Sequence, residues 1–142
     1  VTENNGVAFV TGGGNIYSFS GVQAFTVTLP GSGSPLPHDV WLRISTLGTP
    51  AASVATLNGV EAAAVESFAA TISGGFGGDE KEWYWRWTAP SAPSYTFEFQ
   101  SASSSLSLDQ LAVYAAPVPE PETYALFALG LAGLALARRR RG

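Results

Sequence analysis

The chain has 142 residues, 13% of which are charged, and it contains neither Cys nor Met. This length is too short for two full-sized domains, and the lack of Cys excludes a disulfide scaffold, a thiolate metal site and a cysteine nucleophile. The isoelectric point of about 4.8 argues against general nucleic-acid binding, which needs a basic surface. The hydrophobic content of 46% is enough to build a core, unlike that of a typical disordered chain.

The charges divide the chain into a body and a tail. Residues 1–117 carry nine acidic side chains and three basic ones, Arg43, Lys81 and Arg86. The remaining residues carry two acidic side chains and four arginines at the very end. We therefore predict a mildly acidic domain over residues 1–116 and a separate C-terminal segment over residues 117–142.

Apolar and polar residues alternate with a period of two through most of the body, which is typical of half-buried strands. The strongest windows are 24–29, 40–44, 82–88, 95–100 and 106–114, with weaker ones at 7–11 and 15–20. In the last strong window, the alternation places Leu106, Leu108 and Gln110 on one face and Leu111 on the other.

Turn residues separate these windows. Asn58-Gly59 is the pair favoured in two-residue hairpin turns. The segment that follows, 60–70, fits an amphipathic helix and a pair of strands equally well. Seven to nine short strands predict a mainly β body, an antiparallel β-sandwich or jelly roll, joined to a C-terminal hydrophobic helix.

The densest aromatic feature is Glu-Lys-Glu-Trp-Tyr-Trp-Arg-Trp at residues 80–87. Its three tryptophans share one face of a strand, and a row of exposed aromatic rings stacks on the apolar faces of sugars. Alternatively, the tryptophans are the core, because a small sandwich without disulfides needs large buried side chains. In that case Tyr84 with Arg86, and Trp41 with Arg43, form outer pairs that make a smaller binding or cation–π surface. The candidate glycan-binding residues are Trp83, Trp85, Trp87, Tyr84, Arg86 and Trp41.

Other titratable residues give little support for catalysis. His38, the single histidine, is expected in a turn, and the chain lacks the Gly-x-Ser-x-Gly motif of a nucleophile elbow. Asp79, Glu80 and Glu82 lack the loop spacing that holds Ca²⁺ and are predicted to lie in a solvated hairpin loop. We expect no enzymatic activity, no cofactor and no metal.

The tail has three parts. Pro117, Pro119 and Pro121 predict an extended spacer, because proline fixes its own φ and disfavours helix in the residue before it. An uncharged run from Tyr124 to Ala137 follows, and it has no polar face of the kind a core helix shows. As a helix the run is about 21 Å long, against about 30 Å for a bilayer core.

A start near Glu122, snorkelling arginines and local thinning of the bilayer make up much of this difference. We therefore predict a short transmembrane helix over residues 123–137, with the C-terminal arginines on the cytoplasmic side. Its apolar residues are Tyr124, Leu126, Phe127, Leu129, Leu131, Leu134 and Leu136, and the arginines are Arg138, Arg139, Arg140 and Arg141.

Pro119-Glu120-Pro121, followed by a short apolar helix and a terminal arginine cluster, resembles the PEP-CTERM sorting signal over residues 118–142. The resemblance implies export through the inner membrane of a Gram-negative bacterium. It also implies cleavage near Pro-Glu-Pro by exosortase, a membrane transpeptidase-like enzyme, and association with exopolysaccharide and biofilm. In this interpretation the Pro-Glu-Pro residues are recognised by exosortase and do no chemistry themselves. The chain begins without a basic and apolar leader, which we expect to have been removed.

These observations predict a non-enzymatic, exported protein of the cell surface or extracellular matrix. The alternatives are a carbohydrate-binding module with an aromatic platform, and a self-assembling fibre subunit that pairs through exposed strand edges. The expected partners are exosortase, the inner membrane transiently through the C-terminal helix, exopolysaccharide and further copies of the chain. Nucleic acid is not among them.

Overall fold

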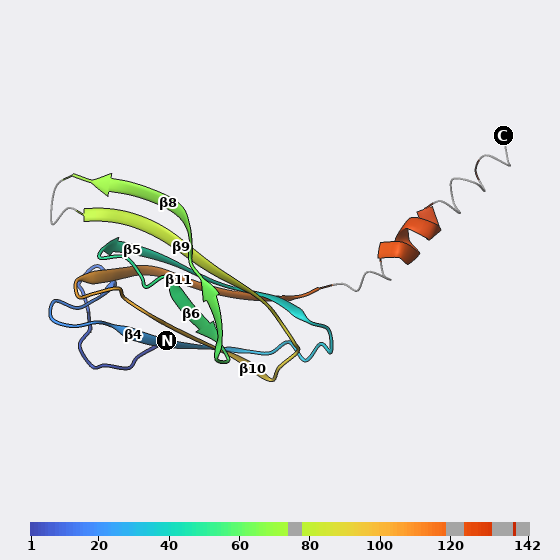
Figure 1. Ribbon diagram of the computed structural model, residues 1–142, viewed down its shortest axis with the longest axis horizontal. Helices are drawn as coiled ribbons and strands as arrows, with labels where there is room; N and C mark the ends of the chain where they lie inside the picture. Colours follow the sequence, from blue (N-terminus) through green and yellow to red (C-terminus); the bar gives the residue numbers. More distant parts are fainter. Residues whose placement is uncertain (74–77, 119–123, 132–137, 139–142) are drawn as a thin grey trace.

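The computed structural model describes residues 1–73, 78–118, 124–131 and 138. It confirms a mainly β protein in which two antiparallel sheets pack as a sandwich, with a short helix at 124–131 (Figure 1). β11 ends where the tail begins, and the backbone N–H of Val118 still donates to the carbonyl of Pro37 at 2.8 Å.

The first sheet has five strands in the order β1-β4-β10-β6-β7. Their bounds are Thr2–Glu3 for β1, Ala24–Pro30 for β4, Ser94–Gln100 for β10, Val54–Leu57 for β6 and Val60–Ala63 for β7.

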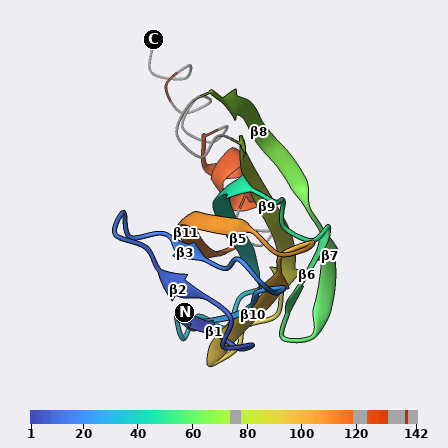
Figure 2. The ribbon, with the colours of Figure 1, turned by 90° about the vertical axis from the view of Figure 1, so that its left-hand side faces the viewer.

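The second sheet has six strands in the order β2-β3-β11-β5-β9-β8 (Figure 2). Their bounds are Phe9–Val10 for β2, Ile16–Tyr17 for β3, Leu106–Pro117 for β11, His38–Gly48 for β5, Gly78–Ala89 for β9 and Val65–Ile72 for β8. The weaker predicted windows at 7–11 and 15–20 therefore contain only two short strands, β2 and β3.

The core lies between the inner faces of the two sheets, and in β4, β5 and β10 it consists of the apolar positions that the alternation placed on one face. Aromatic side chains form a large part of it, and Phe25 and Phe99 stack with ring centroids 4.9 Å apart. Its other large members include Leu42, Ile44, Leu57, Trp85, Trp87, Tyr95, Phe97, Leu106 and Leu108.

The ambiguous segment 60–70 is strand throughout except at Ala64, and its two strands belong to different sheets. β7 pairs with β6, whereas β8 pairs with β9. The predicted turn at Asn58-Gly59 joins β6 to β7, and both residues have positive φ, 48° and 81°. This is the conformation of a tight type I′ hairpin turn.

The predicted faces of β11 are wrong beyond Leu108. The pairing of β11 with β5 shifts register between Leu108 and Gln110, as at a β-bulge. A bulge inserts one extra residue and so reverses the alternation of side chains after it. Gln110 is consequently exposed, while Leu111 and then Val113 pack against the core.

Candidate functional site

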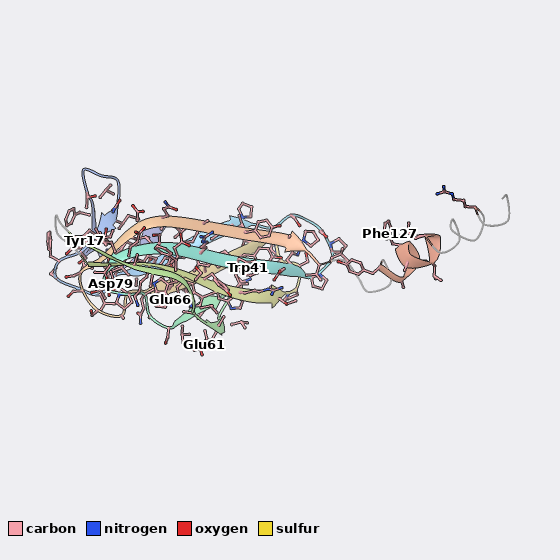
Figure 3. All side chains as sticks on the ribbon, turned by 90° about the horizontal axis from the view of Figure 1, so that it is seen from above. Tyr17, Trp41, Glu61, Glu66, Asp79 and Phe127 are labelled. Atoms are coloured by element: carbon pink, nitrogen blue, oxygen red, sulfur yellow. The ribbon has the colours of Figure 1, made fainter. Side chains whose placement is uncertain are left out.

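The outer face of the six-stranded sheet carries the most distinctive side chains of the body. It presents the residues that alternate with the core positions of β11, β5 and β9, and Figure 3 labels one of them, Trp41 on β5. Strand register aligns these residues in two rows. One row runs Ala112, Arg43, Tyr84, Val65, and the next runs Tyr114, Trp41, Arg86.

A hollow of about 590 Å³ lies on this face, lined by Trp41, Arg43, Ser67, Tyr84, Ala112 and Tyr114. It exists because two small side chains, Ser67 and Ala112, leave space beside much larger ones. Ser67 falls within the register shift between Glu66 and Phe68 of β8.

Three aromatic rings dominate the hollow. Trp41 and Tyr84 pack against each other with ring centroids 5.1 Å apart and planes at 39°. Tyr114 is directly opposite Trp41 across β11 and β5, and it remains 60% exposed. The guanidinium carbon of Arg86 lies 4.9 Å from the Trp41 ring centroid, within the range of a cation–π interaction. The hollow therefore offers ring faces and edges to a ligand.

Ion pairs border the aromatic rings. Arg86 donates from Nε and Nη2 to the two carboxylate oxygens of Asp39, at 2.7 and 2.9 Å. This hydrogen bonding holds the pKa of Asp39 below its ordinary value and raises the pKa of Arg86. Arg43 pairs with Glu82 on the same face.

The third cation, Lys81, lies on the inner face of the same sheet. It donates to Glu66 at 2.8 Å and sits 5.5 Å from the Trp83 ring centroid. All three basic side chains of residues 1–117 are thus paired with carboxylates.

The structure places the three predicted tryptophans of β9 toward the core rather than on an exposed platform. Trp85 and Trp87 are 0% and 6% exposed, and Trp83 is half-buried with its indole N–H donating to Thr46. Burying their large apolar surface between the sheets stabilises the fold more than exposing it to water would. The remaining candidates, Tyr84, Arg86 and Trp41, come together on the opposite face.

Sequence reasoning missed Ser67 on β8 and the two residues that β11 contributes to the hollow, Ala112 and Tyr114. For β11 the signal was present as a second alternation, in which Leu111 and Val113 are the inward positions. It was masked because the bulge puts this alternation out of phase with the first half of the strand.

His38 does not occupy a turn: it is the first residue of β5 and is 1% exposed. Its Nε2 lies 2.7 Å from the hydroxyl of Ser32, and its ring packs against Tyr95. Asp39 is on the other face of β5, bound to Arg86, because adjacent residues of a strand point to opposite sides. The two residues are therefore not part of one catalytic group.

The predicted acidic loop is part of strand β9. Asp79 accepts a hydrogen bond from Thr71 at 2.8 Å, whereas Glu82 pairs with Arg43, so the two carboxylates are engaged separately. Among the described residues, no group of three or more metal-ligating side chains comes together.

In the tail, the helix at 124–131 exposes its apolar side chains: Tyr124, Leu126, Phe127, Leu129 and Leu131. Pro119, Glu120, Pro121, Leu134, Leu136, Arg139, Arg140 and Arg141 lie outside the described residues. Over the part of the chain that is described, no helix has both the length and the apolar character needed to cross a bilayer.

Comparison with known proteins assigns the tail. Residues 117–141 match the family model of the PEP-CTERM protein-sorting motif, which confirms the resemblance drawn from Pro-Glu-Pro, the apolar run and the arginines. The motif implies that the protein is exported and directed to exosortase for processing at the membrane. No curated protein and no solved structure matches the chain.

Proposed function

We propose that this protein is a non-enzymatic component of the cell surface or extracellular matrix of a Gram-negative bacterium, and that its body binds a neutral polysaccharide. The observation that carries the proposal is the aromatic hollow on the outer face of the six-stranded sheet. The sorting motif supports an extracellular setting in which such a ligand is abundant.

The chemistry of the hollow suits a pyranose ring. A sugar presents apolar C–H faces, which pack on aromatic rings as other apolar groups do, and hydroxyl groups around its rim. Tyr114 and Tyr84 supply ring surface, while the exposed guanidinium of Arg43 supplies hydrogen-bond donors. The volume of about 590 Å³ lies within the range of small-molecule sites.

The charges favour a neutral sugar over an acidic one. The body carries nine acidic and three basic side chains, and all three cations are already paired with carboxylates. An anionic polysaccharide would meet a repulsive field, and the carboxylate paired with each cation would offset the attraction of that cation.

The hollow also lacks the groups that glycoside cleavage requires. Hydrolysis of a glycosidic bond normally uses two carboxyl groups flanking the bond, whereas none of the described residues that line the hollow is acidic. This composition supports binding without catalysis.

Affinity electrophoresis of the full chain in mild detergent tests the binding site. We expect retardation in gels that contain dextran or a soluble β-glucan, and none in gels that contain alginate. Tyr114→Ala should weaken the retardation about tenfold, equivalent to about 1.4 kcal/mol. Phe19→Ala is the matched control, because Phe19 is also an exposed aromatic (71%) but lies outside the hollow. Equal retardation of Tyr114→Ala and wild type would refute the site.

A second experiment tests whether the C-terminal motif directs export and exosortase processing. In a host with exosortase, the extracellular protein should have lost the mass of the residues that follow the Pro-Glu-Pro region. Replacing Pro119, Glu120 and Pro121 with alanine should leave the full-length chain in the membrane fraction. An extracellular product that still carries Arg138 to Arg141 would contradict exosortase processing.

A further inference from the structure

β8 is the long unpaired edge of the six-stranded sheet. Among the residues that the structure describes, it pairs only with β9, and Figure 1 shows it at the border of the sheet. All eight of its residues are exposed. An edge of this kind presents a row of free backbone N–H and C=O groups to any strand that can approach.

The stretch 68–72 of this edge carries no protective device. Proteins usually block an open edge with lysine, proline, an inward-pointing charge or a β-bulge. On β8 the one charged residue, Glu66, which pairs with Lys81, and the register shift both lie before residue 68. Three apolar side chains of β8 are 40–46% exposed: Val65, Phe68 and Ile72.

The pairing with β9 shows which residues of β8 share a face. Phe68, Ala70 and Ile72 are opposite Glu82, Glu80 and Gly78, and therefore lie on the outer face with the ion pair of Glu82 and Arg43. Ala69 and Thr71 are opposite Lys81 and Asp79 and lie on the inner face. The register shift between Glu66 and Phe68 interrupts this pattern before residue 68.

We propose that β8 pairs antiparallel with β8 of a second copy of this chain, centred on Ala70. This register matches outer residues with outer residues, as strand pairing requires. It sets Phe68 of each copy opposite Ile72 of the other, an aromatic–β-branched pair that favours strand association, and it brings the two small Ala70 side chains together. Glu66 stays outside the paired stretch 68–72, so no like charges meet.

The assembly closes as a dimer and does not grow into a fibre. An antiparallel pair of identical strands is a two-fold, self-complementary contact, which leaves no second copy of the same surface exposed. At the other border of the sheet, β2 has only two residues and offers little backbone for further pairing. The fibre alternative is thereby replaced by a pair of sandwiches that share one continuous sheet.

This pairing is independent of the proposed saccharide binding, but it has a consequence for it. Because paired side chains lie on the same face, the two-fold axis is normal to the sheet, and the two hollows face the same direction. A long polysaccharide that engages both is held more tightly than one that engages a single hollow.

The test measures the mass of the full chain in detergent by sedimentation over a wide range of protein concentration. We expect the mass of two copies, and one copy for Ala70→Lys, because two ammonium groups would meet at the two-fold axis. Val65→Lys is the matched control: it adds the same charge to the same strand outside the paired stretch and should remain dimeric. A monomeric wild type, an Ala70→Lys variant that remains dimeric, or open-ended polymers would overturn the proposal.

A disulfide cross-linking experiment tests the register. Because the chain contains no Cys, an introduced cysteine is the single thiol of each copy. Directly opposed residues have Cβ atoms about 5 Å apart, so Ala70→Cys should form a disulfide-linked dimer under mild oxidation. Val65→Cys should not, because residues 65 of the two copies would be about 33 Å apart along the strands. Efficient cross-linking of Val65→Cys but not of Ala70→Cys would refute the register.

Discussion

Trp85 and Trp87 lie on the same face of β9 and are both buried, but their indole N–H groups have different surroundings. Nε1 of Trp87 donates to the carbonyl of Val60 at 2.9 Å. Nε1 of Trp85 is buried and has no hydrogen-bond partner among the described residues. The two side chains therefore form a matched pair: both are buried, but only the indole N–H of Trp87 has a hydrogen-bond partner.

We expect Trp87→Phe to lower the free energy of unfolding by about 2 kcal/mol more than Trp85→Phe does. Both substitutions delete the same ring atoms from a buried site, so the costs of lost transfer energy and residual cavity nearly cancel in the comparison. Trp87→Phe loses a hydrogen bond worth about 0.5–1.5 kcal/mol, whereas Trp85→Phe removes an unsatisfied buried donor that costs about 1–3 kcal/mol.

Urea unfolding of the full chain in mild detergent, followed by circular dichroism, measures the difference. The slope of the free energy of unfolding against urea concentration should be the same for wild type and both variants. A changed slope would indicate that a different amount of surface is exposed on unfolding. Equal losses for the two variants, or a larger loss for Trp85→Phe, would refute the reasoning about the indole N–H groups.

Three further outcomes are expected. Gly59→Ala should cost about 1–2 kcal/mol of stability in urea unfolding, because Gly59 has φ of 81° in open surroundings and a Cβ disfavours that conformation; no loss would contradict the type I′ turn. Asp39 has a pKa lowered by Arg86, so its ionised form contributes stability above its ordinary pKa of 3.8, and this contribution is lost as pH falls through the lower, folded-state pKa. Below about pH 4 the free energy of unfolding of the wild type, measured by thermal unfolding, should therefore fall more steeply with pH than that of Asp39→Asn. The difference should be at most about 1 kcal/mol for a partly exposed pair, and the same pH dependence in both proteins would contradict this. Ala112→Trp should fill the hollow and abolish retardation by dextran or β-glucan while leaving the unfolding transition nearly unchanged, and retained binding would place the saccharide elsewhere.

The sequence by itself determined five of the strands, one turn and the tail. The period-two windows correspond to β4, β5, β9, β10 and β11 because a half-buried strand needs apolar side chains at alternate positions. Asn58-Gly59 identified its hairpin because few other residue pairs tolerate positive φ at both positions. The sorting motif could be recognised from the sequence because it consists of three elements in a fixed order along the chain and does not depend on packing.

Tertiary structure alone decided which strands pair with one another, and which faces of β9 and of the second half of β11 are buried. β9 carries aromatic residues on both faces, so alternation grouped its tryptophans but did not show whether they or Tyr84 meet the other sheet. The bulge in β11 brought Tyr114 to the outer face, and the split of 60–70 between two sheets left β8 at an open edge. These features depend on pairing between residues distant in the chain, which local periodicity does not encode.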